Sequence, residues 1–142
     1  MKIGPLLAHL DELEEAYAQA LRDASARFQD DQDVFHQCLT FGNAADAARQ
    51  KLAPLRERYS GEPEWEVVQT APGKVLLEEL RGLYLMAHQV AVSWVMAQQA
   101  AKAARDADLK EAAGERHTEA DIEAKWFLTR IKVGAPQALV VA

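Results

Sequence analysis

LLEELRGLYLMAHQVAVSWVMAQQAA, residues 76–101, decides the fold, because its apolar side chains recur at alternating steps of four and three residues. That spacing places one stripe along a single face of an α-helix and predicts a helix over about residues 74–105. The stripe consists of Leu76, Leu80, Leu83, Ala87, Val90, Trp94, Ala97 and Ala101. A second apolar row, which begins at Leu77 and Tyr84, makes this face wider than one bundle core covers. We therefore expect this helix also to be buried against a second copy of the chain.

Three further segments carry the same spacing and predict helices over about residues 5–29, 31–59 and 108–133. Aspartates precede the second and the fourth of the four helices, and their side chains can cap the first turns by accepting backbone N–H groups. Pro54 lies inside the second segment, where it removes a backbone donor, so we expect either a kink there or a break after which the helix restarts. Four amphipathic helices without strand-like alternation predict an all-α fold, a four-helix bundle.

Two segments, residues 60–74 and residues 135–142, lie outside the four predicted helices. Residues 60–74 contain two glycines and two prolines, which exclude a regular helix and predict a long crossover connection between helices 2 and 3. Gly134 and Pro136 are typical of a helix end, so the fourth helix should stop near residue 133. The apolar tail that follows, residues 135–142, is expected to dock on an apolar surface, and a homodimer could form either through this tail or through the third helix.

The length and the charge of the chain narrow its class and its partners. A chain of 142 residues fits one domain, residues 1–142. Its net charge of −6 argues against a nucleic-acid partner and against an anionic membrane surface, because both need a positive patch. The sequence shows no secretory signal and no apolar run long enough to cross a bilayer, so we expect a cytoplasmic protein.

The four amphipathic segments and the long middle connection resemble the ferritin-like superfamily. The segment KWFLTRIKVGAPQAL, residues 125–139, is similar to the closing helix of small bacterial ferritin-like proteins. The resemblance implies a ferritin-like four-helix bundle, and a di-metal centre in such a bundle needs inward carboxylates and Glu-x-x-His pairs. No such pair exists here, because Asp33, Leu85 and Gly114 precede His36, His88 and His117 by three residues. Where such a pair belongs on the second helix, residues 43–48 are rich in alanine, so we expect the metal site to be lost.

Some residues that can bind a metal remain. His117, Glu119 and Glu123 are close together on the fourth helix, and His88 lies in the second apolar row of the third. If the two histidines faced one another, a rearranged site completed by Glu123 or Cys38 could bind iron or zinc. The alternative is that the histidines are satisfied core or boundary residues and that the acids form a solvated face.

The remaining candidates for chemistry have simpler explanations. Cys38 lies on the apolar stripe of the second helix, which favours an inert buried thiol. The sequence lacks a nucleophile elbow and a Gly-rich phosphate loop. Four aromatic residues at helical spacing are typical of a core, although they could also line a pocket for a small apolar ligand. These four are Trp65, Tyr84, Trp94 and Trp126.

The acidic residues of the first helix, Glu14 among them, are expected on its solvated face, which leaves no ionisable group organised at the centre of the bundle. The sequence therefore predicts a non-enzymatic, homodimeric helical bundle that acts as an interaction or small-ligand-binding scaffold and needs no cofactor. The competing interpretation is a divergent metal-binding or redox ferritin-like protein.

Overall fold

The computed structural model describes residues 2–141 and contains α-helices but no strand within that range. The helices are α1 (Ile3–Arg27), α2 (Gln32–Arg56), α3 (Leu76–Ala104) and α4 (Ala107–Pro136), and a short π-helical segment, η1 (Gln137–Val141), continues α4. The all-α class and the four predicted helices are confirmed, with ends within three residues of the predicted ones.

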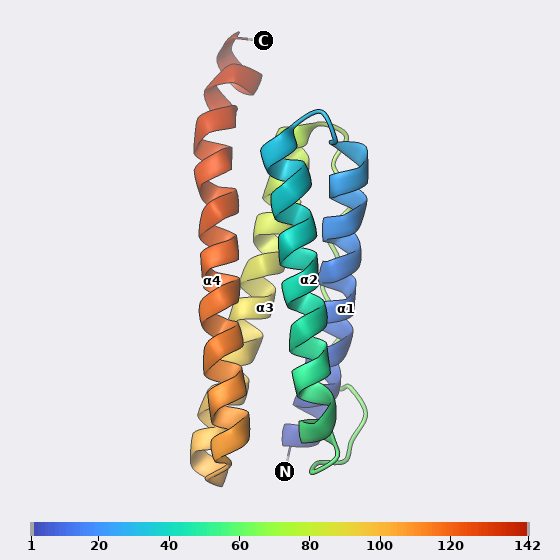
Figure 1. Ribbon diagram of the computed structural model, residues 1–142, viewed down its shortest axis with the longest axis vertical. Coiled ribbons are helices and arrows are strands. Elements are labelled where there is room, and N and C mark those ends of the chain that lie inside the picture. Colours follow the sequence, from blue (N-terminus) through green and yellow to red (C-terminus); the bar gives the residue numbers. More distant parts are fainter. Residues whose placement is uncertain (1, 142) are drawn as a thin grey trace.

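The helices pack as two antiparallel hairpins (Figure 1). The closest pairs are α3 with α4 and α1 with α2, and the hairpins meet where α1 packs on α3 and α2 packs on α4. This order around the bundle places α1 diagonally opposite α4. Side chains of α1 and α4 that point inward therefore meet across the middle of the core.

The core is built from the apolar stripes of all four helices. Its largest buried apolar side chains are Leu7, Leu10, Leu13, Tyr17, Leu21, Leu52, Leu83, Met86, Trp94, Leu109 and Phe127. Alanines fill much of α2 and α4, among them Ala45, Ala113 and Ala120, each fully buried. Because alanine side chains are short, α2 and α4 leave room near the bundle centre for long side chains from the other helices.

The predicted aspartate caps are confirmed. Asp31 accepts a hydrogen bond from the Val34 backbone N–H at 3.1 Å and starts α2, and Asp106 accepts from Leu109 at the same distance and starts α4. An N-cap side chain satisfies a backbone N–H that has no partner inside the helix. The turn between α3 and α4 is accordingly short, with Arg105 in the left-handed backbone region at a φ of 58°.

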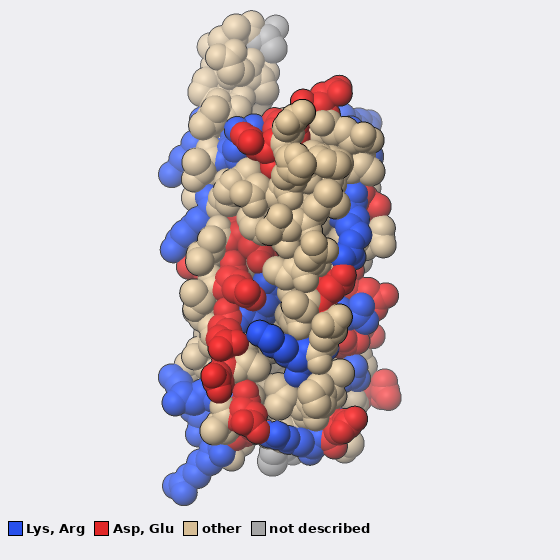
Figure 2. Space-filling model, viewed as in Figure 1, with Lys and Arg blue, Asp and Glu red and all other residues tan. Residues whose placement is uncertain are grey.

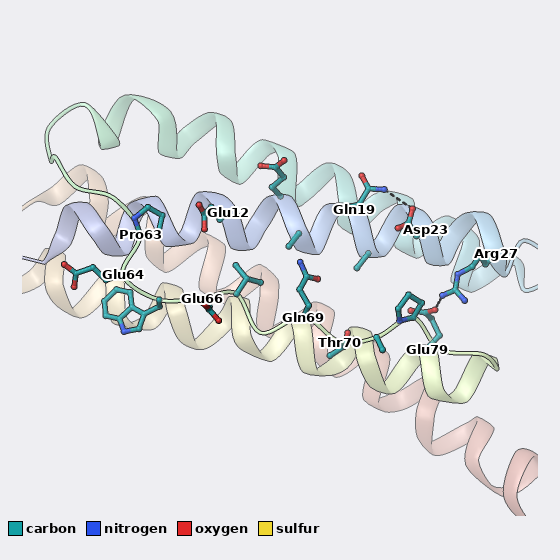
Figure 3. Close-up of a pocket in the computed structure, with 17 residues that line it drawn as sticks. Glu12, Gln19, Asp23, Arg27, Pro63, Glu64, Glu66, Gln69, Thr70 and Glu79 are labelled. Atoms are coloured by element: carbon teal, nitrogen blue, oxygen red, sulfur yellow. Dashed lines mark hydrogen bonds and ion pairs between the residues drawn. The ribbon is translucent and has the colours of Figure 1, made fainter.

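The connection between α2 and α3 runs alongside α1 for most of that helix (Figure 3). At one end Gly61, with a φ of 144°, lies against Pro5, where an added Cβ would come within 2.6 Å of the Pro5 Cδ. At the other end Arg27 donates a hydrogen bond to the Gly73 carbonyl at 2.6 Å. Glycine is required at position 61, since other residues rarely adopt this φ and a side chain would not fit.

Two helix ends differ from the prediction. α2 ends at Arg56 instead of near residue 59, and Pro54 lies in its last turn, where the missing N–H leaves one fewer hydrogen bond to hold the helix end. α4 does not stop at Gly134 but continues through Pro136 into η1. Gly134 keeps a helical backbone, and its carbonyl accepts the Gln137 N–H.

The C-terminal segment projects beyond the bundle and does not dock on it (Figures 1 and 2). Leu139 and Val140 are 74% and 82% exposed, and Val133 one turn before η1 is also exposed. Figure 2 shows this projecting end free of charged groups, whereas acidic side chains gather along α4 below it. Between residues 2 and 141, no helix is long and apolar enough to cross a membrane.

Candidate functional site

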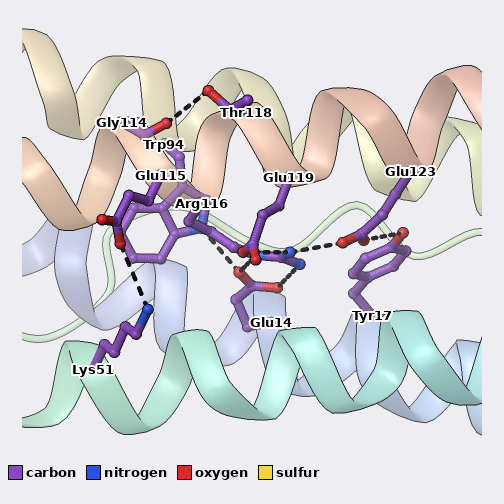
Figure 4. Close-up of polar contacts among 10 residues, drawn as sticks. All are labelled: Glu14, Tyr17, Lys51, Trp94, Gly114, Glu115, Arg116, Thr118, Glu119 and Glu123. Atoms are coloured by element: carbon purple, nitrogen blue, oxygen red, sulfur yellow. Dashed lines mark hydrogen bonds and ion pairs between the residues drawn. The ribbon is translucent and has the colours of Figure 1, made fainter.

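A cluster of ionisable side chains lies at the centre of the bundle (Figure 4). Glu14 of α1, and Arg116 and Glu123 of α4, are only 0%, 3% and 2% exposed. The cluster corrects the prediction that the centre holds no organised ionisable group and that Glu14 lies on a solvated face. Charged side chains are almost never buried to this degree unless they are paired, so the pairing defines the site.

The guanidinium of Arg116 joins the two carboxylates. It grips Glu14 with two parallel hydrogen bonds, from Nε to Oε2 at 2.6 Å and from Nη2 to Oε1 at 2.9 Å. Its Nη1 donates to Oε2 of Glu123 at 2.8 Å. Bidentate, charge-assisted bonds of this kind are the strongest that side chains make, and they hold Arg116 in one orientation.

Two aromatic side chains complete the hydrogen bonding of the carboxylates. Trp94 of α3 donates from Nε1 to Oε2 of Glu14 at 2.9 Å. Tyr17 of α1 donates its hydroxyl to Oε1 of Glu123, also at 2.9 Å. Every oxygen of both carboxylates therefore accepts at least one hydrogen bond, which meets the requirement for burying a polar group without a large penalty.

Helical spacing places these side chains at one level of the bundle. Glu14 and Tyr17 are three residues apart on α1, so they share a face. Arg116 and Glu123 are seven residues apart on α4, two turns on the same face, and Ala120 lies between them with no exposed surface. The small Ala120 side chain leaves the space through which the long Arg116 side chain reaches Glu123.

Burial and the charges inside the cluster shift the pKa values of its ionisable groups. Burial raises the pKa of Glu14 and of Glu123, and the charge and hydrogen bonds of Arg116 only partly oppose this effect. Burial and the nearby charge of Glu123 raise the pKa of Tyr17 well above its ordinary value, so the phenol stays protonated and donates. Burial lowers the pKa of Arg116, but the Glu14 and Glu123 carboxylates raise it by more, so Arg116 remains a cation. With both glutamates ionised the cluster carries one excess negative charge.

A small cavity of about 30 Å³ between α2 and α4 reaches the cluster from outside. Alanines 47, 48 and 112 line it, with Trp94 and Arg116 at its inner end. Lys51 and Glu115, whose charged groups are 3.5 Å apart, also line the cavity, as does Glu119, whose carboxylate is 3.6 Å from Nη1 of Arg116. A cavity of this size holds one or two water molecules and excludes an organic substrate.

The structure does not bring the predicted metal ligands together. His88 is exposed and its Nε2 is 2.9 Å from the Tyr84 hydroxyl, while Glu119 is exposed on α4 and Glu123 points into the buried cluster. His117 is half-buried, and its Nδ1 has no hydrogen-bond partner. Within residues 2–141, no group of three or more His, Cys, Asp or Glu side chains is arranged to hold a metal ion.

The other predicted candidates are also dispersed. Cys38 is fully buried, and burial raises its thiol pKa to about 12, which agrees with an inert thiol. The aromatic residues do not line one shared pocket. Trp94 belongs to the buried cluster, Trp126 packs edge-on against Phe41 and Phe127, and Trp65 lies 43% exposed in the connection.

Sequence reasoning missed Glu14 and Arg116, although a signal for both is present. Positions 7, 10, 14, 17 and 21 follow the same alternation of three and four as the predicted stripe of α1. Positions 109, 113, 116, 120, 123 and 127 do so on α4. A charged residue at a stripe position on each of two helices, with opposite signs, was the available indication of a buried pair.

Comparison of the chain with protein-family models, with curated proteins and with solved structures gives no match.

Proposed function

We propose that this protein is a non-enzymatic four-helix bundle of the ferritin-like type, in which a guanidinium takes the place of a metal centre and which acts as an interaction scaffold. The observation that carries the proposal is the position of Arg116 between the inward carboxylates of Glu14 and Glu123. Ferritin-like di-metal proteins use inward carboxylates at mid-bundle to bind two cations. Here one cation of the chain itself, Arg116, binds both carboxylates.

Three features of the site support this reading. All four carboxylate oxygens are already bonded to Arg116, Trp94 or Tyr17, so a metal would have to displace strong charge-assisted bonds. Within residues 2–141, no imidazole is hydrogen-bonded to a member of the cluster: His9 bonds the Trp65 carbonyl, His88 bonds the Tyr84 hydroxyl, and Nδ1 of His117 has no partner. The cavity beside the cluster has room for water only.

Metal analysis of protein purified without chelator tests the proposal. We expect less than about one-tenth of an iron or zinc ion per chain, before and after incubation with either metal under reducing conditions, as charge-assisted bonds already occupy the carboxylates. A stoichiometric metal that is lost in a Glu14→Gln/Glu123→Gln variant would overturn the proposal.

A metal-binding or redox bundle is the second candidate, and a specific observation favours it. His88 and His117 both lie close enough to Asp121 to lower the pKa of its carboxyl, after the larger effect of the hydrogen bond from Lys125. A metal bound on this outer face of α3 and α4 would disappear in a His117→Ala variant and persist in the glutamate variant. The same elemental analysis therefore separates the two metal sites.

We also propose that the scaffold is a homodimer. Leu139 and Val140 of η1 are exposed, and an apolar groove of about 310 Å³ lies beside them. One wall of this groove is the start of α3, with Leu76, Leu77 and Leu80, and the other wall is the end of α4 and the start of η1. A two-fold axis would place the projecting segment of each chain on the groove of the other, which is a self-complementary contact. The exposed apolar row on α3 (Leu85, Val92 and Met96) is the competing contact surface.

Sedimentation velocity at micromolar concentration distinguishes the two contact surfaces. We expect a dimer that dissociates in a Leu139→Ser/Val140→Ser variant and persists in a Val92→Ser/Met96→Ser variant, because only the first pair projects beyond the bundle. A monomeric parent protein would contradict the dimer altogether.

A further inference from the structure

A long groove lies between α1 and the connection that runs beside it (Figure 3). Its volume is about 1260 Å³, and it is lined on α1 from Glu12 to Arg27 and on the connection from Pro63 to Pro72. At 1.5 Å per residue, the α1 side is roughly 22 Å long. Ala16 and Ala20 are among the residues of α1 that line it, and their short side chains leave the middle of the groove open.

The groove is strongly acidic. Six carboxylates line it, those of Glu12, Glu15, Asp23, Glu64, Glu66 and Glu79. The single cation that lines it, Arg27, is paired with Glu79. Within residues 2–141 neither Glu12 nor Glu66 has an ion-pair partner. Two other lining carboxylates are paired from outside the groove, Glu64 with Lys2 and Glu15 with Arg49. Carboxylates still outnumber cations here, and a groove with an excess of one sign of charge concentrates ligands of the opposite sign, so the potential favours a cationic ligand.

The connection presents an unpaired backbone edge to this groove. Both polar groups of the Val68 backbone bond to the Gln89 side chain of α3, the N–H at 2.9 Å and the carbonyl at 2.8 Å. The Trp65 carbonyl bonds on the other side, where it accepts from Nδ1 of His9 on α1 at 3.2 Å. In extended backbone the N–H and carbonyl groups of successive residues point to opposite sides. Those of Val67 and Gln69 therefore point toward α1, and no partner for them exists in the described part of the chain.

We propose that this acidic groove binds an extended segment of another protein that carries lysine or arginine. The segment would pair with the backbone of Val67 and Gln69 as an added strand, and its basic side chains would face Glu12 and Glu66. A groove of roughly 22 Å accommodates about six extended residues at 3.4 Å each. This inference rests on the proposed scaffold function and names the kind of partner that the scaffold takes.

Backbone pairing and charge make separate contributions to binding, and only together do they point to a peptide that carries basic residues. The carboxylates alone would suit any polycation, such as a polyamine. The unpaired N–H and carbonyl groups of Val67 and Gln69 need a ligand that offers both donors and acceptors at strand spacing, which a peptide does and a polyamine does not.

Titration calorimetry with a capped hexapeptide of alternating lysine and threonine tests the proposal. We expect saturable binding that weakens steeply as the salt concentration rises from about 20 mM to about 200 mM, because salt screens the attraction between the lysines and the groove carboxylates. A hexapeptide of alternating glutamate and threonine should not bind. Failure of the lysine peptide to saturate, or equal binding of the glutamate peptide, would overturn the inference.

A charge variant with a matched control locates the ligand. Glu12→Gln/Glu66→Gln removes two unpaired groove carboxylates and should weaken the lysine peptide by about tenfold, the effect of two partly exposed charge pairs. Glu57→Gln/Glu111→Gln removes the same charge from exposed positions outside the groove and should change affinity by less than about twofold, since screening weakens distant charges. Equal weakening by both variants would reduce the effect to net charge and overturn the groove assignment.

A backbone variant tests strand pairing separately. Gln69→Pro removes the N–H that faces the groove, whereas Gln69→Ala removes only the side chain. We expect Gln69→Pro to weaken the peptide at least about fivefold, the loss of one hydrogen bond, and Gln69→Ala to leave its affinity within about twofold. Circular dichroism should show both variants folded. Unchanged affinity in folded Gln69→Pro, or spermine binding as tightly as the peptide, would overturn strand pairing. Neither result would alter the metal content that tests the proposed function.

Discussion

At the centre of the bundle, the guanidinium of Arg116 faces two carboxylates that reach it from different helices. Transfer of these charges out of water opposes folding, and the five hydrogen bonds within the cluster compensate only while all partners are present. Substitutions of the arginine and of a glutamate should therefore differ in their effect on stability. Removal of Arg116 leaves two buried carboxylates, whereas removal of one glutamate leaves a matched pair of opposite charges.

Substitution of Arg116 by leucine should therefore be strongly destabilising. We expect the free energy of unfolding at pH 7.5 to fall by about 3–5 kcal/mol, the usual cost of breaking a buried pair from one side. At pH 5 the loss should be smaller, because the two buried carboxylates can then take up protons. Urea denaturation at both pH values measures this. Arg22→Met, which removes a half-exposed ion pair with Asp46, should cost less than about 1 kcal/mol.

The raised pKa values of Glu14 and Glu123 give stability a definite pH dependence. Because burial raises both values, the folded protein holds more protons than the unfolded chain above the ordinary glutamate pKa of about 4.3. The free energy contributed by these groups is therefore greatest below that pH and is lost as the pH rises through the folded pKa values. Asp106 and Asp121 have the opposite effect, because hydrogen bonds from Tyr59 and Lys125 lower their pKa values. The stability that they contribute is present above the ordinary aspartate pKa of about 3.9 and is lost as the pH falls below it.

Replacement of Glu14 by glutamine should flatten this dependence. We expect the difference in unfolding free energy between pH 4.5 and pH 7.5 to shrink relative to the parent, because one of the two groups that bind extra protons in the folded state is gone. Urea denaturation across this range measures the difference. Glu12→Gln, the corresponding change at a neighbouring exposed position, should leave it unaltered, and a shift of equal size in Glu12→Gln would refute the explanation.

At the scale of single helices, local side chains set most of the ends. Asp106 starts α4 by accepting the Leu109 N–H, and it also receives hydrogen bonds from Arg58 and from the Tyr59 hydroxyl. Arg58 and Tyr59 come directly after α2. The Asp106 side chain therefore also connects the end of α2 in the first hairpin to the start of α4 in the second.

Asp106→Ala should destabilise the protein by about 1–2 kcal/mol, the range measured for loss of an N-cap. Asp106→Asn should recover much of the loss, because the amide oxygen can still accept the Leu109 N–H. Thermal unfolding of the two variants measures both changes. If asparagine is as damaging as alanine, the charge facing Arg58 matters more than the cap.

At the scale of the whole molecule, the buried cluster joins α1, α3 and α4 through side chains that are about a hundred residues apart in sequence. A buried ionic network can fix the register of helices without adding to stability. Small buried alanines line α4, so the cluster gives this helix defined partners on α1 and α3 where its apolar contacts are weakest.

Apolar replacement of the complete cluster separates register from stability. The variant Glu14→Leu/Tyr17→Phe/Arg116→Met/Glu123→Leu should match or exceed the parent in stability, by about 1–4 kcal/mol, since no charge then needs to be desolvated. Urea denaturation measures the stability, and near-ultraviolet circular dichroism of the buried Trp94 reports whether packing stays unique. An unfolded variant would show that apolar packing cannot fill this space.

The sequence by itself determined the four helices, the two aspartate caps and the break over residues 60–74, because helical periodicity, capping and Gly–Pro punctuation act within a few residues of the chain. It did not determine whether residues at the edge of an apolar stripe face the core or the solvent. Successive helical positions turn by about 100°, so Glu14 and Arg116 could face either solvent or core. Only the tertiary structure decided this, because a charge is buried where an opposite charge from another helix meets it. His88 and His117 do not join Glu123, because His88 is exposed and His117 half-buried, whereas Glu123 points into the buried cluster.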